Sequence, residues 1–195
     1  MSARTQDMTT IRQERRTDAA AREQLLDTAY GAVRFSKPSE RLRRGRQPAD
    51  GLSFVAVEDG RLVGTLRLWP VTAGAGRPAV LLGPLAVHPD CRKRGIGAAL
   101  VKRALRAARN NGHRAVLLVG DVSYYGRFGF SAEKTSQLRL PGLSEAHRLL
   151  GLEVTQGALD GARGSIGLPV PRVPALAPLV EAIAHRARRM VPQAA

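Results

Sequence analysis

The chain has 195 residues, of which 44% are apolar and 4% aromatic, and its formal net charge is +15. This length predicts one domain with a modest extension. The single cysteine, Cys91, excludes a disulfide framework within the chain and a structural zinc site built from several cysteines. No apolar run reaches the roughly 18 residues of a membrane span, and the first residues lack the apolar stretch of a secretory signal. We therefore expect a soluble cytoplasmic protein.

The basic residues gather in clusters, and 27 of the 31 are arginines. Eight of them, and no acidic residue, lie between Asp90 and Asp121. Such clusters either form solvated faces or bind nucleic acid. The scarcity of aromatic residues counts against stacking on single-stranded bases.

Before residue 79 the sequence predicts a flexible or strand-forming segment over 1–17, a helix over 18–30 and a short basic helix over 39–46. Two strands over 52–58 and 61–69 and a loop over 70–78 follow. Asp59-Gly60 lies between the two strands and is a strong hairpin signal.

A wholly apolar run over 79–87 predicts a strand that is buried on both faces. Gly83-Pro84 interrupts this run and predicts a bulge or splay, because proline cannot donate to a ladder. A helix over 97–111 and a buried strand over 114–119 complete a β-turn-α-β unit, which implies parallel strands.

The C-terminal third predicts one helical turn and three further strands, over 122–127, 137–140, 149–155 and 164–168. A proline-rich linker and an amphipathic helix are expected over 169–195. The folded domain should therefore cover 18–168.

The segment after the strand at 79–87 turns through Arg92-x-x-Gly95-x-Gly97 into a helix. A helix N-terminus presents unpaired N–H groups and a partial positive charge, and glycine lets the backbone approach a ligand. The pattern predicts an anion site suited to a pyrophosphate, with Arg92, Lys93 and Arg94 as countercharge. The Gly-Lys-Ser/Thr of a Walker loop and the third glycine of a dinucleotide fingerprint are absent.

Leu85-Ala86-Val87-His88-Pro89, followed by Arg92-x-x-Gly95-x-Gly97, resembles the acetyl-coenzyme A signature of the GNAT superfamily of N-acetyltransferases. Residues 120–130 resemble the second motif of that family, in which a tyrosine, here Tyr125, precedes Gly-Phe by four positions. Residues 83–130 are most similar to the bacterial YhbS-like subgroup, and the resemblance extends more weakly over 10–168.

The resemblance implies an α/β (α+β) fold with a mixed, mostly antiparallel central sheet, a splayed pair of parallel strands and flanking helices. It implies that the acetyl group moves from acetyl-CoA directly to an amine, with Tyr125 as general acid at the sulfur. Backbone groups of Leu85, Ala86 and Val87 would hold the pantetheine arm, and one of their N–H groups would stabilise the oxyanion. The pyrophosphate would lie against the N–H groups of Arg92, Lys93, Arg94, Gly95, Ile96, Gly97 and Ala98. No metal is implied.

The general base is not assigned by the motifs, because the strands at 79–87 and 115–119 lack the glutamate that some relatives carry. Water, Glu133, Asp121 or an unplaced carboxylate remain candidates. Asp121 is interpreted first as a cap of the short helix, and a substrate contact is the alternative. Tyr124 is less favoured than Tyr125 as the acid, because its spacing to Gly129 is one residue too long. His88 is interpreted as stabilising its turn, and nothing assigns Cys91 a catalytic role.

Two alternatives remain beside the enzyme: a non-catalytic acyl-CoA sensor, and a basic protein that associates with RNA or ribosomes. The acceptor would be a small-molecule or peptide amine, and a homodimer is a further expectation from the family. A basic cleft would favour a carboxylate-bearing amine, but the sequence does not place Arg34, Arg41 or Arg67 on it.

Overall fold

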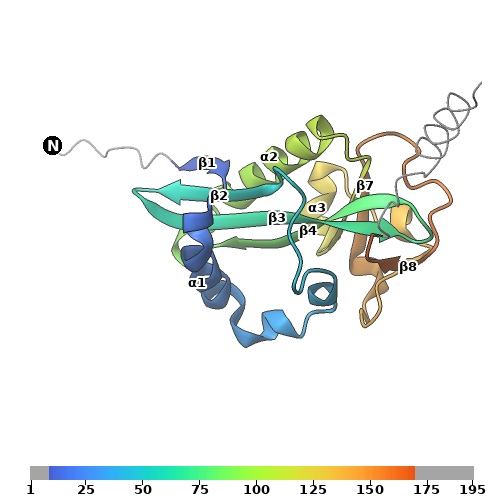
Figure 1. Ribbon diagram of the computed structural model, residues 1–195, viewed down its shortest axis with the longest axis horizontal. Helices are drawn as coiled ribbons and strands as arrows, with labels where there is room; N and C mark the ends of the chain where they lie inside the picture. Colours follow the sequence, from blue (N-terminus) through green and yellow to red (C-terminus); the bar gives the residue numbers. More distant parts are fainter. Residues whose placement is uncertain (1–8, 170–195) are drawn as a thin grey trace, which may run out of the picture.

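A computed structural model of the protein describes residues 9–169, so the predicted helix of the C-terminal extension lies outside the described residues (Figure 1). The strands are β1 (Thr10–Gln13), β2 (Ser53–Glu58), β3 (Arg61–Ala73), β4 (Pro78–Val87), β5 (Ala115–Val119), β6 (Leu138–Arg139), β7 (Leu149–Glu153) and β8 (Gly164–Gly167). The α-helices are α1 (Ala19–Tyr30), α2 (Ile96–Asn110) and α3 (Val122–Tyr125). Single 3₁₀ turns are η1 (Arg16–Asp18), η2 (Gly31–Phe35), η3 (Pro38–Leu42), η4 (Pro89–Cys91), η5 (Gly126–Phe128), η6 (Glu133–Thr135) and η7 (Ala146–Arg148).

The strands form one mixed sheet with the order β1-β2-β3-β4-β5-β7, and β8 pairs with both β3 and β6. The pairs are antiparallel except β4 with β5 and the two-residue contact of β6 with β8. The expected mixed, mostly antiparallel sheet is confirmed, as is the parallel pair on either side of α2.

The sheet lies between α1 and α2, which cover opposite faces (Figure 1). Buried side chains at helical spacing on α2, among them Leu100 and Ala104, pack against β2, β3 and β4. On the other face, Leu25 and Leu26 of α1 pack with Ala86 of β4. Side chains alternate along a strand, so Leu85 and Val87 pack with the α2 core.

The predicted hairpin at Asp59-Gly60 is confirmed. Glu58 pairs with Arg61, and φ is +48° at Asp59 and +77° at Gly60. Two consecutive residues with positive φ make a type I′ turn, whose twist suits a two-residue hairpin.

The predicted loop over 70–78 is wrong, because β3 continues to Ala73 and leaves only 74–77 as the turn. Pro70 pairs with Val80 of β4. The Ala73 N–H bonds to the Arg77 carbonyl at 2.8 Å, so alternation turns the backbone of Pro70 away from β4. Among the described residues, no strand pairs there with the other side of β3, so the missing proline donor costs no ladder bond.

The basic helix expected over 39–46 is shorter, a 3₁₀ turn at Pro38–Leu42. It carries the chain from the end of α1 across to β2 and lies beside the middle of β4, where both contribute to one cavity. This placement brings η2 and η3 to the edge of the functional site.

Strands β4 and β5 separate as the sequence predicted. They pair only at Val80 with Val116 and at Leu81 with Leu117. The register of β4 against β3 shifts opposite Gly83-Pro84, whose peptide bond is cis. Residues 85–87 pair with β3 alone, so a gap opens between β4 and β5.

Candidate functional site

The loop from β4 into α2 has the geometry of an anion site. Lys93 and Gly95 both have positive φ, at +61° and +81°, and Gly95 is the N-cap of α2 without a capping side chain. The first bond of the helix joins the Ala99 N–H to the Gly95 carbonyl at 3.0 Å. The preceding N–H groups of the first turn, from Ile96 to Ala98, therefore have no partner in the helix and are available to an anion.

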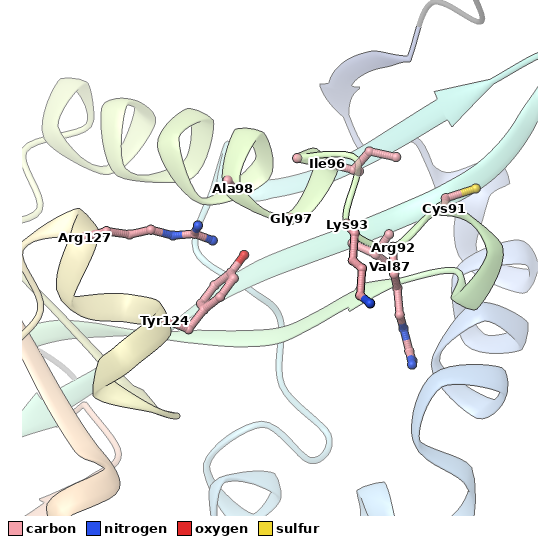
Figure 2. A pocket seen from close by; sticks show the side chains of 10 residues that line it. Val87, Cys91, Arg92, Lys93, Ile96, Gly97, Ala98, Tyr124 and Arg127 are labelled. Atoms are coloured by element: carbon pink, nitrogen blue, oxygen red, sulfur yellow. The ribbon is translucent and has the colours of Figure 1, made fainter.

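A cavity of about 440 Å³ lies over this turn, and we call it the loop cavity (Figure 2). Its lining residues are Val87, Cys91, Arg92, Lys93, Gly95, Ile96, Gly97, Ala98, Tyr124 and Arg127. In Figure 2 the Tyr124 hydroxyl points towards the first turn of α2. The Arg127 guanidinium lies 4.1 Å from the centre of the Tyr124 ring. Tyr124 and Arg127 were missed as site residues, because only the return of the chain after β5 brings them here.

Arg94 differs from its neighbours Arg92 and Lys93, which line the cavity. Its guanidinium pairs with the Glu58 carboxylate through two nitrogens, one of them at 3.0 Å. Glu58 also accepts from the Thr9 hydroxyl at 2.9 Å. The expected countercharge from the Arg94 side chain is therefore already balanced, and the pair fixes the loop to the end of β2.

The backbone of β4 offers polar groups to the gap at alternate residues. The His88 N–H bonds to the Val63 carbonyl of β3 at 2.8 Å. Alternation then turns the N–H of Ala86 towards β3, and those of Leu85 and Val87 towards the gap. The Leu85 carbonyl faces the gap too, since it accepts a hydrogen bond from the Tyr30 hydroxyl.

A second cavity, of about 100 Å³, lies at this gap, and we call it the gap cavity. Its lining residues are Tyr30, Arg34, Lys37, Ser39, Glu40, Arg43, Leu82, Gly83, Pro84, Leu85, Val119 and Tyr125. The same stretch of β4 lines both cavities, since Leu85 lines this one and Val87 lines the loop cavity. Trp69 supports this wall, because its indole N–H bonds to the Gly83 carbonyl at 2.7 Å.

Two consecutive tyrosines divide the cavities: Tyr124 lines the loop cavity and Tyr125 the gap cavity. Their rings meet edge-on with centres 4.8 Å apart, and Tyr125 also packs edge-on against Phe130 at 5.9 Å. Burial raises the pKa of Tyr125 well above its ordinary value, and Tyr30, Tyr124 and Asp121 act in the same direction. The phenol is therefore protonated at neutral pH and can donate a proton.

The charged side chains of the gap cavity come from η2 and η3. Arg43 is 7% exposed and pairs with Glu40 at 3.0 Å. The Lys37 ammonium lies 4.0 Å from the centre of the Tyr30 ring. Sequence reasoning missed Tyr30, Lys37, Glu40 and Arg43, since short 3₁₀ turns have no periodicity that would tell which residues face inward. Of the three arginines considered for a basic cleft, Arg34 lines this cavity.

The other two arginines lie elsewhere. Arg41 is exposed, and Arg67 pairs with Glu14.

The proposed cap by Asp121 is wrong. Asp121 occupies the N-cap position of α3, but its side chain makes no capping hydrogen bond. Instead the carboxylate lies 3.4 Å from Arg148 Nε. Glu133, the other named base candidate, is exposed on η6, and neither acid lines a cavity described above.

His88 and Cys91 have local roles. The His88 ring accepts from the Asp90 N–H at 3.4 Å, within its own turn, as predicted. Cys91 is buried beside Glu58. Among residues 9–169, no group of three or more His, Cys, Asp or Glu side chains could hold a metal ion. No helix in the same range is long and apolar enough to cross a membrane.

Comparison with known proteins decides the family. The model of the acetyltransferase (GNAT) family matches residues 19–130, which is more than half of the chain. The chain belongs to the GNAT acetyltransferase family. The matched residues contain α1, the sheet from β2 to β5, α2 and both tyrosines. Membership of the GNAT family assigns acetyl transfer as the class of reaction.

The GNAT chain is similar to YhbS of Escherichia coli K12, an uncharacterized N-acetyltransferase. The two are 33% identical over 119 residues, which cover 59% of this chain and 70% of the relative. The crystal structure of Escherichia coli YhbS in complex with CoA superposes with a TM-score of 0.71 and 27% identity, over 85% of this chain and 92% of that one. A GNAT acetyltransferase from Brucella melitensis, in complex with acetyl-CoA, has a TM-score of 0.63 and 30% identity over 83% and 96% of the two chains.

Proposed function

We propose that this GNAT protein transfers the acetyl group of acetyl-CoA directly to an amine, with the coenzyme in the loop cavity and the reaction in the gap cavity. The observation that carries the proposal is that neighbouring residues of β4, Val87 and Leu85, and the consecutive tyrosines Tyr124 and Tyr125 line the two cavities. Similar structures with CoA and acetyl-CoA bound support the same coenzyme here. The acceptor amine enters the gap cavity from the side that η2 and η3 line.

The coenzyme would be held mainly by backbone groups. Its pyrophosphate would accept from the open N–H groups at the start of α2, from Ile96 to Ala98, where the helix dipole also favours an anion. Arg92 and Lys93 would add countercharge. The pantetheine arm would run along β4 and use the polar groups of Leu85 and Val87 that face the gap.

The chemistry follows from the groups around the gap. The amine nitrogen attacks the acetyl carbonyl carbon, the new N–C bond forms, and the C–S bond breaks with its electron pair going to sulfur. The oxyanion donor is the N–H of Leu85 or Val87, since the Ala86 N–H faces β3. The Tyr125 phenol donates its proton to the leaving sulfur. Its raised pKa means that donation must coincide with the build-up of negative charge on that sulfur.

Glu40 is the acid best placed to serve as the base. It is the one Asp or Glu side chain in the lining of the gap cavity, and its side chain is 21% exposed. An acceptor that arrives as an ammonium ion has to lose a proton before it can attack, which for a lysine-like amine at neutral pH costs about 4–5 kcal/mol. A carboxylate beside the amine lowers this cost by accepting that proton, directly or through water.

The proposal is tested first by calorimetric titration of acetyl-CoA into the full chain and two tryptophan variants. A Cβ atom at Gly97 would already lie 3.0 Å from the Tyr124 hydroxyl, so Gly97→Trp should fill the loop cavity and abolish binding. Ala99→Trp is the matched control, because Ala99 is exposed on α2 and outside the cavity lining. Equal binding by all three proteins would refute the loop cavity as the coenzyme site.

Turnover separates the enzyme from a non-catalytic acyl-CoA sensor. Release of CoA is followed with a panel of amines, with the wild type and Tyr125→Phe compared at equal acetyl-CoA occupancy. An acetyltransferase forms an acetylated amine, and the phenylalanine variant forms it at least about a hundredfold more slowly. Tight acetyl-CoA binding without any acetylated amine would favour the sensor.

A further inference from the structure

The gap cavity has an uneven charge lining. Its three basic side chains and one acidic side chain all come from η2, η3 or the residues beside them: Arg34, Lys37, Arg43 and Glu40. Arg34 is already balanced, since it pairs with Glu23 at 2.7 Å and with Asp27 at 2.9 Å. Glu40 balances Arg43. Of the three basic side chains in this lining, Lys37 is the one for which residues 9–169 provide no acidic partner.

Lys37 is held in this position without a counterion. Its ammonium lies over the face of the Tyr30 ring, 4.0 Å from the ring centre, a contact that orients a cation but does not neutralise it. Burial lowers the pKa of Lys37, and the nearby Arg43 and Arg148 lower it further by repulsion. An anion in the cavity would relieve both effects.

Arg43 adds an unsatisfied donor to the same wall. Its side chain is 7% exposed, and its Nε has no hydrogen-bond partner among the described residues. A buried guanidinium donor left without a partner is destabilising. The guanidinium lies close to the splayed strand, since a Cβ atom built on Gly83 would be 3.9 Å from Arg43 Nη1.

We propose that the acceptor is a small amine that carries an anionic group, a carboxylate or a phosphate, which Lys37 and Arg43 bind while the amine lies at Glu40. The inference rests on the proposed acetyl transfer and names its substrate class. An ammonium ion without an anion would place a second unbalanced positive charge in the cavity. An ammonium ion that brings its own anion adds no net positive charge and gives Arg43 a replacement partner when Glu40 turns to the amine.

The spacing of the two binding groups limits the distance between the amine and the anion. Arg43 Nη2 and Glu40 Oε2 lie 3.0 Å apart. An amine at Glu40 and an anion at Arg43 must therefore be separated by only a few bonds. Short amino acids and amino phosphates meet this condition.

The test uses binding to the complex of the full chain with CoA, which cannot turn over. Calorimetry compares β-alanine with propylamine and O-phosphoethanolamine with ethanolamine, each pair differing in the anion. In at least one pair the anionic member should bind about tenfold more tightly or better, and added salt should reduce the difference. The pair with the larger difference identifies carboxylate or phosphate.

Two variants assign the preference to the cavity. Lys37→Gln should bring the two members of a pair to within about twofold of each other. Arg41→Gln should keep the wild-type preference, because Arg41 is an exposed arginine of the same 3₁₀ turn and does not line the cavity.

Equal binding within both pairs, or an undiminished preference in Lys37→Gln, would overturn the inference. A peptide with an N-terminal aspartate that binds more tightly than β-alanine would overturn its restriction to small acceptors. The same titrations are also made on the protein without CoA, so that the comparison of the amines does not depend on coenzyme binding. Selective binding of the anionic amines without their acetylation would refute the proposed reaction on them and leave the anion site standing, so the two failures are distinct.

Discussion

Gly120 and Tyr125 are packed so closely that a Cβ atom on Gly120 would lie 2.7 Å from Cδ2 of the Tyr125 ring and overlap Cε2. The absence of a side chain at the end of β5 therefore makes room for the ring. Phe130 and Tyr124 hold the ring from other sides. Together these contacts direct the phenol into the gap between β4 and β5.

Gly120→Ala should therefore displace the Tyr125 ring and slow acetyl transfer. We expect kcat to fall by at least about tenfold, towards the loss in Tyr125→Phe, because a misplaced donor forfeits part of the usual 10²–10⁴ from acid catalysis. Acetyl-CoA affinity, measured by calorimetry, should stay within about twofold, because the loop cavity is unchanged.

Gly126→Ala is the matched control for this experiment. A Cβ atom there would meet only Val122, at an ordinary 3.9 Å, and the backbone is helical with φ −57°. If Gly120→Ala were as active as Gly126→Ala, the position of the Tyr125 ring would not matter for the reaction.

The segment from β4 to α3 could be predicted from sequence because its signals are local. The apolar runs of β4 and β5, the helix between them and the turn at Gly95 each depend on neighbours in the chain. The break at Gly83-Pro84 and the resulting separation of β4 from β5 could also be predicted, since proline removes a hydrogen-bond donor. The functional role of Tyr125 could be predicted only from the family motif, because a tyrosine considered alone is as readily a core residue.

The wall of the gap cavity could not be predicted, because its residues are far from Tyr125 in sequence. Tyr30, Lys37 and Glu40 reach it through two short 3₁₀ turns, whose inward faces no pattern of apolar residues marks. The pairing of Arg94 with Glu58 could not be predicted either, because the two residues are far apart in sequence. The sequence does not tell whether the Arg94 side chain binds a ligand or a carboxylate of the protein. The loop predicted from Pro70 onwards was wrong for another reason. A proline at an unpaired edge of a strand has the same local sequence signal as a proline that ends a strand.

Tyr30 and Tyr125 both line the gap cavity, and a pair of substitutions distinguishes their roles. Tyr30 donates to the Leu85 carbonyl, so Tyr30→Phe should lower the free energy of unfolding by about 1 kcal/mol, the usual net value of one hydrogen bond. Urea unfolding measures this. The same variant should retain far more activity than Tyr125→Phe, because the Tyr30 proton is already engaged by a backbone carbonyl. A larger loss of kcat in Tyr30→Phe would make Tyr30 the proton donor.

Glu40→Gln tests the proposed base through the pH dependence of the rate. At pH 7 we expect kcat/KM to fall by about a hundredfold, since the amine then has to lose its proton to water. The loss should shrink as the pH approaches about 10, where the amine itself becomes neutral. Glu133→Gln, at an exposed carboxylate of η6, should behave as the wild type. A loss that is equal at every pH would show that Glu40 acts by holding Arg43 and not by accepting a proton.

Asp18 supplies a prediction on stability, independent of the site. Its carboxylate accepts from Arg12 at 2.6 and 2.9 Å and from the Arg15 N–H at 2.7 Å, and these bonds lower the pKa of Asp18 to about 2. A carboxyl whose pKa is lower in the folded state stabilises the fold at a pH above its ordinary pKa. That contribution is lost as the pH falls through the folded pKa.

Asp18→Asn should therefore destabilise the protein at pH 7 by up to about 1 kcal/mol, as expected of a pair near the surface. The difference should decline below about pH 4 and vanish only below about pH 2, where the carboxyl is protonated in the folded state as well. Urea midpoints with an unchanged m-value measure it, with Asp59→Asn, at an exposed residue of the hairpin turn, as the control. A difference that is as large at pH 2 as at pH 7 would mean that the amide disturbs the turn and that the charge is not the cause.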